Sequence, residues 1–175
     1  MAKSSRQEIE KDEKSVIYEL MKDSSQSINI ISKKLGFSRQ KVWRIIKKLQ
    51  QEKTIWGYTA IIENEKLGMK AYVIIGKRTT KPVPKEKLEP VIKKGFEELA
   101  KSSNCILDDT YYLNGEYDFL TIFKAKNLQD AKKFQEEFNR LYIGFIQKTQ
   151  LFEVLFPLRV KGIFNPNAEK LAEFF

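Results

Sequence analysis

Residues 28–51 read INIISKKLGFSRQKVWRIIKKLQQ, a stretch that predicts two short amphipathic helices joined by a tight turn. Ser27 can cap the first of these helices, and Ser38 can cap the second. Gly36, between them, can take the left-handed backbone conformation that ends a helix. The apolar residues of the second helix have the i, i+3, i+4, i+7 spacing of a buried stripe. They are Val42, Ile45, Ile46 and Leu49. The second helix is therefore expected to pack on a core through one face.

The opposite face of this second helix is basic and polar. At about 100° per residue, the side chains within roughly 40° of the direction opposite the stripe are Gln40, Arg44, Lys47 and Gln51. Lys48 lies roughly 60° from that direction. Such side chains can reach phosphates and base edges while the apolar face fixes the helix. With a first helix expected near 10–22, residues 1–53 are predicted to form a helix-turn-helix DNA-binding domain.

Six residues are the candidates for contacting DNA. Arginine can bind guanine through two hydrogen bonds, and glutamine can read adenine. We predict groove contacts from Arg39, Gln40, Arg44 and Lys47, and phosphate contacts from Ser38 and Lys48. The alternative is a solvated helix face that contacts nothing. Trp43 lies roughly 100° from the buried stripe and is expected to pack at the domain edge.

The positive charge is concentrated at the N-terminal end of the chain. The 175 residues carry 32 Lys and Arg against 23 Asp and Glu, for a net charge of +9. Residues 1–62 hold 13 of the basic residues and 7 of the acidic ones, so two thirds of the excess lies there. This distribution favours a polyanionic partner, double-stranded DNA, although solvated lysines alone could also produce it.

The composition argues against several classes of protein. There is no histidine, which removes the commonest general base and the commonest zinc ligand, and the eight glycines are scattered. The single Cys105 excludes an intramolecular disulfide and is expected to be a packed thiol. No apolar run is long enough to span a membrane, and the N-terminus lacks a signal-peptide core. We expect a cytoplasmic protein without cofactor, metal, membrane contact or catalytic activity.

The second half alternates strands and helices. After a linker strand and turn at 54–68, further strands are expected at 71–76, 106–113, 117–125 and 146–156. One helix should carry Leu88 to Leu99, starting near Glu89 or kinking at Pro90, and Asn127 should cap another. The order βαββαβ predicts an α+β chain with a ferredoxin-like regulatory domain over 69–160. Residues 161–175 form a tail, with a short helix after Pro166.

Both faces of the predicted sheet are apolar. Tyr72 and Ile74 alternate with Val73 and Ile75, although two helices on one side would cover only one face. An open apolar face should find a partner. Pairing of two sheets in a homodimer is the simplest answer, and it would present two recognition helices to two DNA half-sites.

The whole arrangement resembles the Lrp/AsnC family of prokaryotic transcription regulators, also called feast/famine proteins. The resemblance spans roughly residues 10–156 and is carried by Ile31–Ser38, Ile55–Ala60 and Asn114–Leu120. It implies operator-binding dimers joined through the regulatory sheets, often assembled into tetramers or octamers, that commonly sense amino acids. The chain departs from the family where 77–105 is longer, where Thr149 is followed by Leu151 in place of a second threonine, and in the Phe-rich tail.

An amino-acid effector would have its candidate site at Gly115, Tyr117 and Asp118, which match the family's Gly-x-Tyr-Asp loop. A glycine lets backbone groups approach a ligand, and a carboxylate could meet an α-ammonium group. A tight hairpin, with Asp118 bonding its own turn, explains the motif equally well.

Two other functions remain open at this point. One is an enzyme on the same scaffold, similar to haem-pathway decarboxylases. Those enzymes use a histidine at their tetrapyrrole site, and this chain has no histidine. The other is an architectural protein that binds DNA with little sequence preference.

Overall fold

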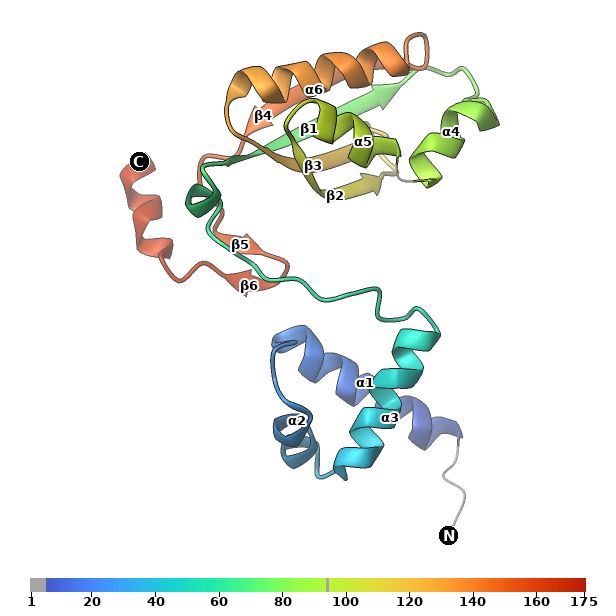
Figure 1. The fold of residues 1–175 in the computed structure, drawn as a ribbon, viewed down its shortest axis with the longest axis vertical. Helices are drawn as coiled ribbons and strands as arrows, with labels where there is room; N and C mark the ends of the chain where they lie inside the picture. The colour runs from blue at the N-terminus through green and yellow to red at the C-terminus, as the bar shows by residue number, and fades with distance from the viewer. Residues whose placement is uncertain (1–5, 94) are drawn as a thin grey trace. The chain divides into compact units, whose positions relative to one another are not determined.

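The computed structural model describes residues 6–93 and 95–175, which form two compact units (Figure 1). One unit contains the residues up to 61 together with 158–175, and the other contains 62–157. The predicted α+β class is confirmed, because a helical N-terminal part precedes a four-stranded antiparallel sheet with its helices. None of the described helices is long and apolar enough to cross a membrane.

The first unit opens with three helices. They are α1 (Arg6–Lys22), α2 (Ile28–Leu35) and α3 (Arg39–Gln51). The three helices pack on one another around four buried side chains: Val16 of α1, Ile31 of α2, and Val42 and Leu49 of α3. Ile45 and Ile46 of the predicted stripe are half-buried. The first helix begins four residues earlier than the expected position 10.

The local signals at the turn between the helices are confirmed. The Ser27 side chain accepts a hydrogen bond from the Ile30 backbone N–H, and Gly36 ends α2 with a φ of 67°. Ser38 begins α3, its hydroxyl accepting from the Lys41 N–H at 3.1 Å. These three positions fix where α2 and α3 begin and where the chain turns between them.

The connector differs from the expected strand. Residues 56–63 belong to no helix or strand, and they lead into a short 3-10 helix, η1 (Asn64–Leu67). A strand needs a neighbour to complete its hydrogen bonds, and residues 6–93 and 95–175 supply none for this segment. Trp56 is consequently 94% exposed.

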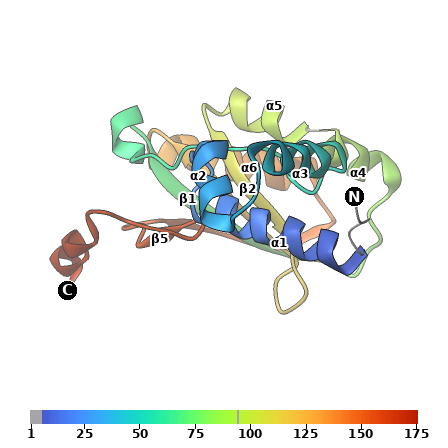
Figure 2. The same ribbon diagram turned by 90° about the horizontal axis from the view of Figure 1, so that it is seen from below.

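The C-terminal tail contains a hairpin that the sequence patterns did not predict. Strands β5 (Arg159–Val160) and β6 (Ile163–Phe164) pair antiparallel, and their turn has positive φ at both Lys161 and Gly162. The hairpin leads to η2 (Ala168–Phe174), a 3-10 helix at the predicted place after Pro166 (Figure 2). Phe174 and Phe175 are exposed, while Leu171 is half-buried.

The second unit contains the four-stranded sheet. Its strands are β1 (Lys70–Arg78), β2 (Ile106–Tyr112), β3 (Phe119–Ala125) and β4 (Ile146–Glu153), in the order β2-β3-β1-β4. The helices are α4 (Lys85–Ile92), α5 (Gly95–Ser102) and α6 (Leu128–Leu141). All neighbouring strands are antiparallel, and α5 and α6 lie over one face of the sheet, which confirms the ferredoxin-like topology (Figure 1).

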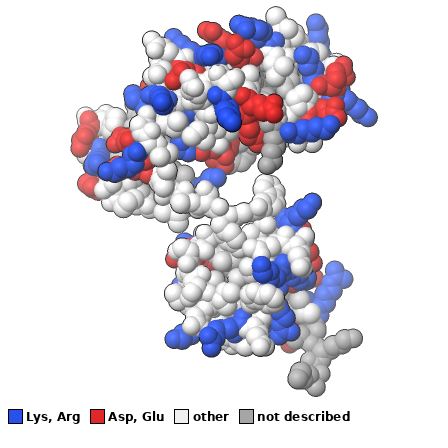
Figure 3. All heavy atoms as spheres, in the orientation of Figure 1, with Lys and Arg blue, Asp and Glu red and all other residues white. Residues whose placement is uncertain are grey.

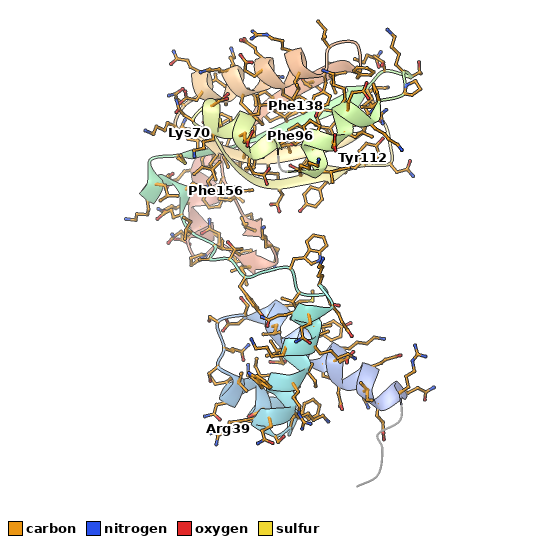
Figure 4. All side chains as sticks on the ribbon, turned by 45° about the vertical axis from the view of Figure 1, so that its right-hand side comes forward. Arg39, Lys70, Phe96, Tyr112, Phe138 and Phe156 are labelled. Carbon is orange, nitrogen blue, oxygen red and sulfur yellow. The ribbon has the colours of Figure 1, made fainter. Side chains whose placement is uncertain are left out.

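Aromatic side chains fill the space between the helices and the sheet. Phe96 of α5 and Phe138 of α6 face each other with ring centroids 5.3 Å apart (Figure 4). Phe119 and Phe123 of β3 contact α6 through Phe138 and Phe134. Asn127 caps α6 as predicted, accepting from the Asp130 N–H at 2.9 Å.

The helix expected around Pro90 is in fact two helices. α4 begins at Lys85 and contains Pro90, so the chain neither starts a helix near Glu89 nor continues through a kink. α5 then restarts at Gly95, where an added Cβ would lie 2.8 Å from the Pro90 carbonyl oxygen. Glycine permits this close return of the backbone, which the periodicity of apolar residues could not reveal.

Cys105 is the packed thiol that the sequence predicted. It is 5% exposed, and burial raises the pKa of its thiol to about 11. Its Sγ donates to the Ser103 carbonyl at 3.4 Å. The thiol is therefore part of the core of this unit.

Candidate nucleic-acid interface

The six predicted DNA contacts lie on α3 and its N-terminal cap. All of them are exposed, and Arg39 lies at the N-terminal end of the helix (Figure 4). Lys and Arg outnumber Asp and Glu on the face of this unit that Figure 3 shows. The helix is therefore held by its apolar side while its polar side meets solvent.

Three of the basic residues on α3 have uncompensated charges. Within the described part of the chain, no carboxylate lies within ion-pair distance of Arg39, Arg44 or Lys47. The Arg44 Nε donates to the Gln40 carbonyl one turn earlier at 3.4 Å, which directs the guanidinium along the helix. These side chains are available to a polyanionic ligand.

Two other lysines of α3 pair with carboxylates of α1. The Lys41 Nζ lies 2.6 Å from Asp12, and it also lies 3.9 Å from the centroid of the Phe37 ring. The Lys48 Nζ lies 2.6 Å from Glu13, whose hydrogen bond is the largest cause raising the pKa of Lys48. The sequence patterns did not reveal these pairs, because Glu13 and Lys48 are 35 residues apart.

Trp43 is 51% exposed. Half of its surface packs on the domain and half is open to solvent. It lies on the same helix as the candidate contacts, so a ligand bound along α3 could reach its exposed edge.

The candidate effector residues occupy the loop 113–118 between β2 and β3. The loop is longer than a two-residue Asn-Gly turn, and Gly115 does not have the positive φ of such a turn. The Asp118 Oδ2 accepts from the Arg78 backbone N–H at 2.7 Å, and the Tyr117 hydroxyl donates to Gln150 Oε1 at 2.9 Å. The side chain of Asp118 thus bonds the end of β1 and not its own turn.

Arg78 and Thr149 make further polar contacts in this unit. The Arg78 guanidinium donates to the Tyr112 hydroxyl at 2.5 Å, and its Nε is buried without a hydrogen-bond partner among the described residues. The Thr149 Oγ1 receives hydrogen bonds from Gln135 and Asn139 of α6, each at 2.9 Å. Thr149 therefore ties β4 to α6.

Comparison with other proteins supports a DNA-binding regulator. The family model of winged helix-turn-helix DNA-binding domains matches residues 13–55. An HTH-type transcriptional regulator of Pyrococcus abyssi is 32% identical over 143 residues, covering 82% of this chain and 89% of the relative. A second one, of Pyrococcus furiosus, is 30% identical over 142 residues, covering 81% and 88%.

Solved structures of Lrp/AsnC proteins have the same fold. LrpC of B. subtilis is 19% identical with a TM-score of 0.57, covering 91% of this chain and 99% of that protein. AsnC of E. coli is 20% identical with a TM-score of 0.55, covering 85% and 95%. A transcriptional regulator of Neisseria meningitidis in complex with L-Met is 16% identical with a TM-score of 0.59, covering 90% and 94%.

Proposed function

Because the chain belongs to the HTH-type transcriptional regulators and has the Lrp/AsnC fold, we propose that it binds operator DNA sequence-specifically as a homodimer. The observation that carries this proposal is the exposed face of α3, where three basic side chains have no carboxylate partner in the described structure. A buried apolar stripe fixes the helix, so that face can enter a major groove as a rigid unit.

The contacts on DNA divide between bases and phosphates. Arg39, Gln40, Arg44 and Lys47 are proposed to face the groove, where arginine and glutamine distinguish guanine and adenine. Ser38 accepts the capping hydrogen bond from Lys41, and its hydroxyl can still donate to a phosphate oxygen. The Lys48 Nζ lies 2.6 Å from the Glu13 carboxylate, so Lys48 can contact a phosphate only when this ion pair opens.

The open face of the sheet is the proposed dimer interface. Val73 of β1 lies between Ile122 of β3 and Phe152 of β4, and the three side chains form an apolar row across the strands. Val73 and Ile122 are half-buried and Phe152 is 49% exposed, although all three lie on the face that α4–α6 leave uncovered. A second copy of the same face would remove this row from water.

Modulation by an amino acid is proposed for the loop 113–118. The L-Met complex of the Neisseria regulator supports this class of effector for proteins of this fold. Asp118 uses Oδ2 to accept from Arg78, which leaves Oδ1 to meet an α-ammonium group. Tyr117 and the Gly115 backbone are the neighbouring candidates in the same loop.

We also propose that the protein catalyses no reaction and acts in the cytoplasm, where its DNA target lies. The relatives at 30% identity or more are transcription regulators, which supports a binding function.

Fluorescence anisotropy tests the proposed function. The duplex upstream of the protein's own gene is compared with a shuffled duplex across a salt series. A preference of about 10³ or more at physiological salt is expected from a sequence-specific regulator. Equal binding to both duplexes, lost steeply as salt rises, would instead favour the architectural protein. An absence of binding at low salt would contradict the assignment of α3.

A further inference from the structure

The recognition helix carries two classes of basic residue. Lys41 and Lys48 are seven residues apart, and both lie on the side of α3 that faces α1. Arg39, Arg44 and Lys47 have no carboxylate partner in the described ranges 6–93 and 95–175. The difference arises from α1, which presents Asp12 and Glu13 to one side of α3 only.

The carboxylates of the two ion pairs are more shielded from solvent than those of ordinary surface pairs. Both have an N–O distance of 2.6 Å, and the carboxylate side chains are only 22% exposed in Asp12 and 16% in Glu13. Partial burial reduces screening by salt, so these pairs persist where fully exposed pairs would be weakened. Glu52 adds a second carboxylate 3.8 Å from Lys48.

We infer that Asp12 and Glu13 mask Lys41 and Lys48 and thereby restrain sequence-independent binding to DNA. The inference rests on the proposed function of α3. To neutralise a phosphate, a masked lysine must give up its carboxylate, and that carboxylate then repels the DNA. Non-specific affinity depends on the number of phosphates neutralised, whereas base reading depends on residues that the mask leaves untouched. The mask therefore raises the ratio of specific to non-specific binding.

The ion pair of Glu13 with Lys48 is the better one for testing whether a carboxylate partner keeps a lysine of α3 from DNA. Lys41 has a further contact with the Phe37 ring, so the loss of Asp12 would not release it fully. Lys48 is nearer the outer face of α3, and its raised pKa has the Glu13 hydrogen bond as its largest cause. Glu52 is the weaker partner of Lys48, because it lies 3.8 Å away and its side chain is 52% exposed. Removal of the Glu13 charge should therefore turn Lys48 into an additional phosphate contact.

The test measures the affinity of the full-length protein for a shuffled duplex between 50 and 200 mM salt. In Glu13→Gln, the slope of log K against log salt is expected to steepen by about 0.9 per protomer. This slope corresponds to an additional loss of about 3.5-fold per protomer across that fourfold salt range. Binding at 50 mM salt should be tighter than that of the wild type.

Three further variants show whether a change in the salt slope comes from the release of Lys48. Glu136→Gln removes the same charge from an exposed position of α6 in the other unit, so the slope should stay near the wild-type value. The double variant Glu13→Gln/Lys48→Gln should return to the wild-type slope, because the released lysine is gone. Lys48→Gln alone should also leave the slope nearly unchanged, since a masked lysine contributes no phosphate contact.

The outcomes distinguish the inference from the function on which it rests. Failure of the wild type to bind the shuffled duplex even at 50 mM salt would contradict the proposed function. Salt-dependent binding by the wild type, with Glu13→Gln unchanged or weaker, would overturn the mask alone. A shallower slope in Lys48→Gln would overturn it as well, and that variant keeps the test valid if Glu13→Gln fails to fold.

Discussion

The Asp118 carboxylate accepts a hydrogen bond from the backbone N–H of Arg78, 40 residues earlier in the chain, at 2.7 Å. The Asp118 N–H donates to the Gly76 carbonyl at 2.9 Å, so the residue bonds the end of β1 through both its backbone and its side chain. The loop 113–118 is consequently attached to β1, an inner strand of the sheet. A ligand bound by Asp118 would therefore contact a side chain that β1 holds in place.

Asp118 variants separate the structural role from the effector role. Asp118→Ala removes a charge-assisted hydrogen bond and should lower the free energy of unfolding by about 1–3 kcal/mol. Asp118→Asn keeps an acceptor for the Arg78 N–H and should lose less stability, but it loses the charge that an α-ammonium group requires. Urea unfolding and calorimetric titration with the common amino acids measure the two effects. Equal binding of an amino acid by Asp118→Asn and the wild type would leave only the structural role.

The homodimer is tested by placing a charge on the open sheet face. Val73→Lys should convert the dimer to a monomer, because an ammonium group in the apolar row would be buried without a partner. Ile143→Lys is the matched control, since Ile143 is 79% exposed in the turn after α6 and lies outside that row. Sedimentation velocity gives the oligomeric state, with circular dichroism to check the fold. A dimeric Val73→Lys variant would exclude this face as the interface.

The buried thiol predicts both low reactivity and a pH effect. Because burial raises the pKa of Cys105 to about 11, little thiolate forms near neutral pH, and a thiol reagent should label the native protein far more slowly than the unfolded chain. The raised pKa also means that the neutral thiol is favoured in the folded state. Its contribution to stability is fully present below about pH 9 and is lost as pH rises toward about 11. Rapid labelling of the native protein at pH 8 would contradict this burial.

A pair of glycine variants tests the break between α4 and α5. In Gly95→Ala, the added Cβ would lie 2.8 Å from the Pro90 carbonyl oxygen, so the junction must shift and the free energy of unfolding should fall by about 1–3 kcal/mol. Gly115→Ala is the control, because its Cβ meets no atom within 4 Å and its φ is not left-handed. Thermal unfolding of the two variants should therefore differ. Equal stabilities would show that the return of the chain at Gly95 is not tight.

The predictions that the sequence supported were those set by local interactions. Ser27, Ser38 and Asn127 each cap the helix that immediately follows, so their roles could be read from a few neighbouring residues. The continuous apolar run of β1 and the alternating aromatic residues of β3 likewise placed these strands in the sheet.

The features that the sequence did not reveal depend on distant residues. The split at Gly95 depends on the approach of the Pro90 backbone, and the pairing of Lys48 depends on how α1 crosses α3. The hairpin of β5 and β6 has strands of two residues each, too short for their alternation to be seen. In the connector, apolar and β-branched residues suggested a strand, but a strand forms only where a hydrogen-bonding neighbour exists.

The central claim, that the outer face of α3 reads DNA, is tested most directly by selecting duplexes from a random library with the full-length protein. The wild type should enrich a pseudo-palindromic sequence with half-sites about one helical turn apart. Arg44→Ala/Lys47→Ala, with its fold and oligomeric state verified, should enrich no sequence. Enrichment of the same sequence by the double variant and the wild type would contradict the assignment of α3 as the recognition helix.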